Sequence, residues 1–157
     1  MEKNQAILPN QVMTKSLPFS AQQTQWLESA CNFIDEARLV DLLMAMVNTP
    51  SPTGYEGPLA KLTVEEMRKC GLQAEYQMMN PDRGNAIGRL RGTGTGPELL
   101  LYSHLDHYVS GAEDDSLVFG NFDLPDLKPE ATRTGRVIHG IGAGNPKAGT
   151  AVALHAA

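Results

Sequence analysis

The chain has 157 residues, of which 41% are apolar and 20% charged, and its 13 Lys and Arg against 18 Asp and Glu give a net charge of −5. This composition is typical of one globular domain and excludes a disordered chain. The acidic balance, with 6% aromatic residues and no Lys or Arg cluster, argues against a nucleic-acid or anionic-membrane surface. No apolar stretch approaches signal-peptide or bilayer-spanning length, so we expect a cytoplasmic location.

The N-terminal half of the sequence predicts an arm followed by three helices. Residues 1–19 are polar, contain two prolines and show no period, which predicts a flexible N-terminal arm. Ser20 and Asp35 are predicted N-caps of two helices with apolar residues at spacings of three and four. Pro58 in a first turn and Gly71 as a left-handed C-cap are the expected ends of a third helix.

Strand patterns follow the third helix. Apolar and polar residues alternate from Leu72 to Met78, which predicts a half-buried strand, and residues 85–91 predict a second one after a turn. The continuous apolar run Glu98–Ser103 predicts a strand buried on both faces. Residues 108–136 show no period and are predicted to form a functional loop, followed by a short strand over 137–139. This order of elements predicts an α/β fold.

Polar residues capable of chemistry follow the predicted buried strand. In open α/β sheets, ligands bind where strands end. His104 and Asp106 are two residues apart on an extended segment and therefore point to the same side, so the carboxylate can orient the imidazole as a metal-ligating histidine requires. The alternative is that His104 only caps the strand through hydrogen bonds. His107 is expected on the opposite side, as a lining or surface residue.

A glycine-rich loop, residues 140–149, precedes a helix predicted to start at Gly149. Backbone N–H groups of such a loop can bind phosphate. The sequence matches neither the P-loop pattern, because Pro146 precedes Lys147, nor the dinucleotide pattern, because Asn145 replaces the third glycine. The structural alternative is that the glycines serve a tight turn and close helix packing.

Other ionisable or sulfur-containing residues receive structural interpretations. His139 and His155 are expected in packing or on the surface, and Asp114 and Asp115 are expected to be solvated loop charges. The two cysteines, at positions 31 and 70, have no metal-binding spacing and are predicted to be reduced structural thiols.

Four blocks, in this order within residues 48–157, resemble the N-terminal part of the zinc aminoacylase family, which includes acetylornithine deacetylase, succinyl-diaminopimelate desuccinylase, carboxypeptidase G and cytosolic dipeptidases. NTPSPTGYEGPLAKLTVEEMRKCGL resembles the family's proline-rich turn and amphipathic helix, and NAIGRLRGTGTGPELLLYSHLDH its strands and HxD motif. An acidic loop separates these from VIHGIGAGNPKAGTAVALHAA, which resembles the glycine-rich metal loop and the next helix. The resemblance implies that residues 20–157 are part of a three-layer, zinc-peptidase-like catalytic domain with mixed strands and no dimerisation domain.

The resemblance also implies roles for individual residues. His104 would be a zinc ligand, Asp106 the catalytic carboxylate that orients it, and Lys147 and Gly149 positioning residues of the loop. Asn145 stands where the family has an aspartate that bridges two zinc ions. A neutral amide offers less charge compensation than a carboxylate, which leaves one metal ion, two or none as alternatives. The implied cofactor is one or two zinc ions, with cobalt as a substitute.

The implied activity is zinc-dependent hydrolysis of amide bonds in N-acyl amino acids or small peptides, by a homodimeric complete protein. The family's general base and later ligands lie beyond the matching region, so we expect a truncated member that is inactive alone. A non-catalytic α/β module or pseudoenzyme piece is the alternative, and nucleotide binding at residues 140–149 is a third. Because Leu99–Ser103 would lack sheet neighbours, the chain is expected to be poorly soluble or dependent on a partner.

Overall fold

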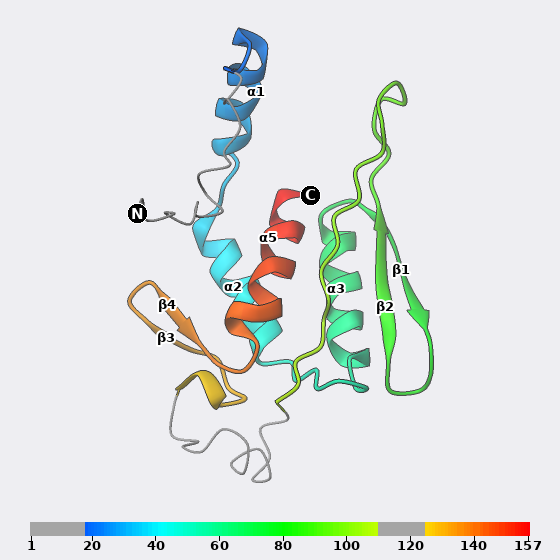
Figure 1. Cartoon of the computed structure of the whole chain (residues 1–157), viewed down its shortest axis with the longest axis vertical. Helices are drawn as coiled ribbons and strands as arrows, with labels where there is room; N and C mark the ends of the chain where they lie inside the picture. Colours follow the sequence, from blue (N-terminus) through cyan, green and yellow to red (C-terminus); the bar gives the residue numbers. More distant parts are fainter. Residues whose placement is uncertain (1–17, 110–124) are drawn as a thin grey trace, which may run out of the picture. The chain divides into compact units, whose positions relative to one another are not determined.

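A computed structural model describes residues 18–109 and 125–157 (Figure 1). The chain divides into two compact units, with the break between Ile34 and Asp35. Most of the predicted N-terminal arm, together with Asp114 and Asp115, lies outside the described residues. No helix in the described ranges is long and apolar enough to cross a membrane.

The first unit contains helix α1, Ala21–Cys31. As predicted, Ser20 caps it: its Oγ accepts from the backbone N–H of Gln23 at 3.2 Å, and the Gln23 side chain accepts from the N–H of Ser20 at 2.9 Å. The expected apolar stripe is present but is not buried, and Trp26 is 64% exposed. In the described part of this unit no second element covers the stripe.

The core of the second unit is made by three helices: α2, Glu36–Val47; α3, Gly57–Lys69; and α5, Ala148–Ala156. Figure 1 shows α2 and α5 side by side, in agreement with their contacts. Their apolar faces meet in one cluster, completed by Leu105 from an extended segment. The buried members of this cluster are Leu42, Met46, Leu59, Ala151 and Leu154.

The predicted start of α2 and both predicted ends of α3 are confirmed. The Oδ1 of Asp35 accepts from the N–H of Arg38 at 3.0 Å at the start of α2, and Pro58 lies in the first turn of α3. Gly71 follows α3 with φ +83°, a left-handed conformation that favours glycine.

An antiparallel hairpin, β1 Gln73–Met78 and β2 Gly84–Arg89, packs on α3. The Asn80 side chain accepts from the N–H groups of Asp82 and Arg83, which closes the predicted turn. Gly88 lies close to α3, because a Cβ there would lie 2.8 Å from the Sδ of Met67 and this side chain would have to shift.

A second hairpin pairs β3, Thr132–Thr134, with β4, Val137–His139, after a short 3-10 turn over Pro125–Leu127. The short strand predicted over 137–139 is therefore confirmed, whereas the prediction of a loop without elements over 108–136 is wrong, because β3 and the 3-10 turn lie within it. The chain then enters the glycine-rich loop, where the N–H of Ile141 donates to the carbonyl of Lys128 at 2.8 Å.

The prediction of a buried strand over Glu98–Ser103 is wrong. This segment is extended coil, and Leu99 and Tyr102 are each 83% exposed. It pairs with no strand of the described residues, because β1 pairs with β2 and β3 with β4. The described residues thus form a mixed α/β arrangement of helices and two small antiparallel sheets, and the three-layer domain stays a prediction.

Candidate metal centre

His104 and Asp106 form the pair that their spacing predicts. The Nδ1 of His104 lies 3.1 Å from the Oδ1 of Asp106 and 3.1 Å from its backbone carbonyl oxygen. Both oxygens are acceptors, so Nδ1 carries the ring proton and donates it. In the neutral ring, a proton on Nδ1 leaves Nε2 with a free lone pair, which is the form of histidine that binds a metal.

The glycine-rich loop brings Asn145 to that lone pair. The Oδ1 of Asn145 lies 3.1 Å from the Nε2 of His104, although the two residues are 41 positions apart. When the ring is neutral with its proton on Nδ1, the lone pairs of Nε2 and Oδ1 face each other across this gap. The contact is satisfied when the ring carries a second proton and Nε2–H donates to Oδ1, when the amide turns its NH₂ group towards Nε2, or when a cation lies between the two atoms.

The spacing of these two atoms fits a zinc ion. Zn–N and Zn–O bonds of about 2.0–2.1 Å in a regular tetrahedron place neighbouring ligand atoms about 3.3 Å apart. The observed 3.1 Å between Nε2 and Oδ1 corresponds to a ligand–zinc–ligand angle of about 100°. His104 and Asn145 can therefore supply two adjacent ligands of one tetrahedral site.

The proline-rich turn after α2 fastens the His104 segment. The N–H of His107 donates to the carbonyl of Ser51 at 3.0 Å, and the N–H of Thr53 donates to the carbonyl of His107 at 3.1 Å. The Ser51 hydroxyl donates to the carbonyl of Leu105 at 2.7 Å. Pro52 and His107 thus form a short parallel β-bridge that keeps the His104 segment extended.

The Thr53 hydroxyl reaches the candidate site itself. Its Oγ1 donates to the Oδ2 of Asp106 at 2.8 Å. This hydrogen bond is the main reason why the pKa of Asp106 lies below its ordinary value, and the hydrogen bond to His104 acts in the same direction. Asp106 is therefore held in its ionised, proton-accepting form.

The loop that carries Asn145 requires glycine at two positions. Gly140 has φ +139°, and a Cβ there would lie 2.4 Å from a methyl carbon of Val47; Gly142 has φ +79°. Both observations support the tight-turn role of these glycines. Gly149, in contrast, lies in α5 without a positive φ, and a Cβ there would meet the Ser103 hydroxyl at an ordinary 3.7 Å.

Lys147 anchors the other side of this loop. Its side chain is 1% exposed, and its Nζ donates to the backbone carbonyls of Thr49 at 3.0 Å and Val47 at 3.4 Å, at the C-terminal end of α2. The partial negative charge of these carbonyls offsets part of the cost of burying the ammonium group. Burial lowers the pKa of Lys147 to about 8.

We expect the free energy of unfolding to rise between about pH 8 and 10.5. Unfolded Lys147 keeps its proton up to its ordinary pKa of 10.5, whereas the folded chain releases it near pH 8. The unfolded state then binds more protons, so stability increases with pH. Relative to Lys147→Met, the parent chain should gain on the order of 1–3 kcal/mol across this range. Urea unfolding at several pH values measures the difference, and a constant difference would contradict this.

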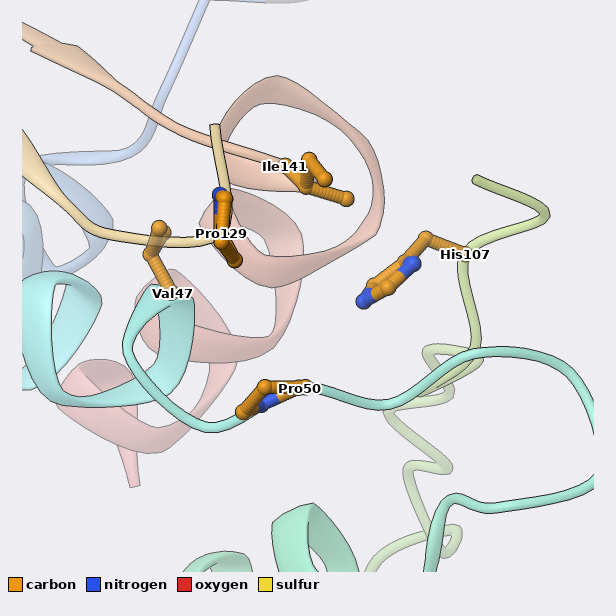
Figure 2. Close-up of a pocket in the computed structure, with 5 residues that line it drawn as sticks. All are labelled: Val47, Pro50, His107, Pro129 and Ile141. Atoms are coloured by element: carbon orange, nitrogen blue, oxygen red, sulfur yellow. The ribbon is translucent and has the colours of Figure 1, made fainter. Parts of the chain in front are cut away.

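His107 is not on the surface but lines a packed apolar cluster. Figure 2 shows its ring facing Val47, Pro50, Pro129 and Ile141, and these five residues leave no space for a water molecule. Its Nε2 accepts from the N–H of Ser51 at 3.1 Å, and its Nδ1 bonds the carbonyl of Val109. With both ring nitrogens engaged in the fold, His107 acts as a structural residue.

The other histidines lie outside the candidate site. The Nδ1 of His139 is 2.9 Å from the Oδ1 of Asp126, and the Nε2 of His155 accepts from the N–H of Asp35 at 3.0 Å. Cys31 is an exposed thiol and Cys70 a half-buried one. Among the described residues, no group of three His, Cys, Asp or Glu side chains is placed to hold a metal ion.

No protein-family model matches the chain, and no solved structure matches it. The candidate site therefore stands on its own geometry. That geometry joins His104, Asp106 and Asn145, as the motifs suggest, and adds Thr53, which sequence reasoning missed. The sequence could have pointed to Thr53 only through its place in the proline-rich block, because Asp106, to which its hydroxyl donates, lies 53 residues away.

Proposed function

We propose that His104 and Asn145 are two ligands of a zinc site in a hydrolase that cleaves amide bonds of N-acyl amino acids or small peptides. The observation that carries the proposal is the 3.1 Å approach of Nε2 of His104 to Oδ1 of Asn145, with Nδ1 of the same ring held by Asp106. Asp106 thus orients the ring, and Nε2 faces the Asn145 oxygen, a second atom that can bind a metal. A metal-ligating histidine whose other nitrogen is held by a carboxylate has the same arrangement.

The convergence of three sequence blocks supports the hydrolase class. The proline-rich turn, the HxD segment and the glycine-rich loop are separate in sequence, and each resembles a block of the zinc aminoacylases. In space, Thr53 contacts Asp106, Asp106 contacts His104, and His104 contacts Asn145. A chance resemblance of short motifs would not require that the blocks meet.

The donor set fits zinc but does not complete a site. Catalytic zinc takes about three protein ligands and leaves one position open. The proposal therefore assigns the remaining ligands and the general base to residues other than those described. Zinc, when bound, supplies Lewis-acid activation of water and of the scissile carbonyl. The residues of this chain orient the imidazole through Asp106, offer the Asn145 oxygen and anchor the loop through Lys147.

The second candidate is a non-catalytic α/β module or pseudoenzyme piece, and the neutral Asn145 favours it. An amide cannot compensate the charge of two cations as a bridging carboxylate does. Nucleotide binding receives less support, because the ammonium of Lys147 faces the backbone carbonyls of Val47 and Thr49 rather than an open phosphate site.

Metal titration tests the proposed site. We expect the chain to bind one Zn²⁺ weakly at neutral pH, and the His104→Ala variant to bind it at least about tenfold more weakly, since one of two ligands is lost. His139→Ala is the matched control, because His139 lies outside the candidate site. Calorimetry with Zn²⁺ and absorption spectra with Co²⁺ measure the binding. Equal losses in both variants, or binding unaffected by His104→Ala, would reject the site.

A further inference from the structure

Thr53 lies behind the pair of residues that prepare the candidate metal ligand. Its Oγ1 donates to Oδ2 of Asp106 at 2.8 Å, while Oδ1 of the same carboxylate lies 3.1 Å from Nδ1 of His104. We propose that Thr53 is a positioning residue that fixes the tautomer and orientation of His104 through Asp106. The consequence for metal binding rests on the proposed function, whereas the effect on the ring does not.

The carboxylate of Asp106 needs such a restraint. The side-chain torsion that turns a carboxylate is broad rather than confined to a staggered position. The Asp106 side chain is 35% exposed, so water competes for its oxygens. A hydroxyl that occupies Oδ2 holds the carboxylate plane and leaves Oδ1 directed at the imidazole.

Thr53 is itself held by the backbone. Its N–H donates to the carbonyl of His107 at 3.1 Å, next to the Pro52–His107 bridge. Beyond it the chain turns, with the N–H of Tyr55 donating to the carbonyl of Pro52 at 2.8 Å and Gly54 at φ +97°. The backbone of Thr53 is therefore fixed by hydrogen bonds. Because a β-branched side chain also has few rotamers, the position of the hydroxyl is restricted.

The side-chain chemistry gives a clean set of variants. Thr53→Val keeps the β-branched shape and removes the O–H donor. Thr53→Ser keeps the donor and removes a methyl group. Thr24→Val is a matched control, because the Thr24 hydroxyl also donates a hydrogen bond, to the backbone carbonyl of Ser20 at 3.2 Å, and Thr24 belongs to the first unit rather than to the candidate site. Positioning through the hydroxyl predicts that only the first variant changes His104.

The tautomer of His104 can be read from long-range ¹H–¹⁵N spectra of the metal-free 157-residue chain. We expect the parent, Thr53→Ser and Thr24→Val to show the Nδ1–H form, and Thr53→Val to show at least a twofold increase in the ratio of Nε2–H to Nδ1–H. Circular dichroism checks folding, and Thr53→Ala carries the same test if the valine variant does not fold. An unchanged ratio in the hydroxyl-free variant, or the same change in Thr53→Ser, would overturn the inference.

A parallel Zn²⁺ titration separates this inference from the proposed function. If both hold, Thr53→Val weakens Zn²⁺ binding about tenfold, the usual loss for a residue that supports a metal-bound histidine. If the ratio changes but the parent chain binds no Zn²⁺, Thr53 still positions His104 and the proposed metal site fails. If the parent binds Zn²⁺ through His104 and Thr53→Val leaves the tautomer unchanged, the metal site stands and the role of Thr53 is rejected.

Discussion

We expect the Asn145→Asp variant to bind Zn²⁺ at least about tenfold more tightly than the parent chain. Two unit charges 4 Å apart in water attract each other by about 1 kcal/mol. A carboxylate oxygen bound to Zn²⁺ is closer than about 4 Å and interacts with two positive charges instead of one. The gain in binding free energy should therefore exceed the ~1.4 kcal/mol that corresponds to a tenfold change in affinity. Calorimetric titration of both chains at the same pH and ionic strength measures this difference.

The control for Asn145→Asp must add the same charge elsewhere. Asn85 is an exposed residue of β2 whose side chain donates to Gln77 on the neighbouring strand, so Asn85→Asp changes the net charge equally without touching the candidate site. The gain should be absent in Asn85→Asp and should disappear when His104→Ala is added to Asn145→Asp. A similar gain in both aspartate variants would mean that net charge, not a ligand, attracts the metal, and would favour the non-catalytic module.

Local signals in the sequence predicted the helices and the first hairpin well, but not β3, which lies within the predicted loop. Ser20, Asp35 and Gly71 determine helix ends through interactions with residues only a few positions away, so their effect is visible without any tertiary context. The same holds for the alternation in β1 and for the short strand β4. The pairing of His104 with Asp106 is also local, because residues two apart on an extended segment share a side.

Non-local contacts account for what the sequence could not show. Nothing in the residues around Thr53 identifies Asp106 as its partner, and the residues that surround the His107 ring, such as Val47 and Ile141, are distant from it in sequence. The run Glu98–Ser103 has the composition of a buried strand, but a strand also needs neighbours, which the described residues do not provide. Only the resemblance placed Asn145 near His104, since 41 residues separate them in sequence.

The unpaired apolar segment leads to the second large expected effect, on self-association. Leu99 and Leu100 are 83% and 85% exposed. Within the described part of the chain, the backbone N–H and C=O groups of residues 99–102 make no backbone hydrogen bond. An extended segment whose backbone N–H and C=O groups are unpaired can form a β-ladder with a second chain, as an exposed edge strand does. We expect the parent chain to self-associate, and the double variant Leu99→Lys/Leu100→Lys to do so at least about tenfold more weakly, because burying one leucine contributes about 1.5–3 kcal/mol.

Sedimentation velocity over a range of concentrations measures this association. The matched control is Val137→Lys/Val152→Lys, which also replaces two exposed apolar residues, 54% and 55% exposed, and also changes the net charge from −5 to −5 + 2 = −3. If charge alone kept the chains apart, both double variants would behave alike. A parent chain that stays monomeric and unfolds in one sharp, cooperative transition would show that Leu99 and Leu100 need no covering partner, and that the extended segment is stable as the structure shows it.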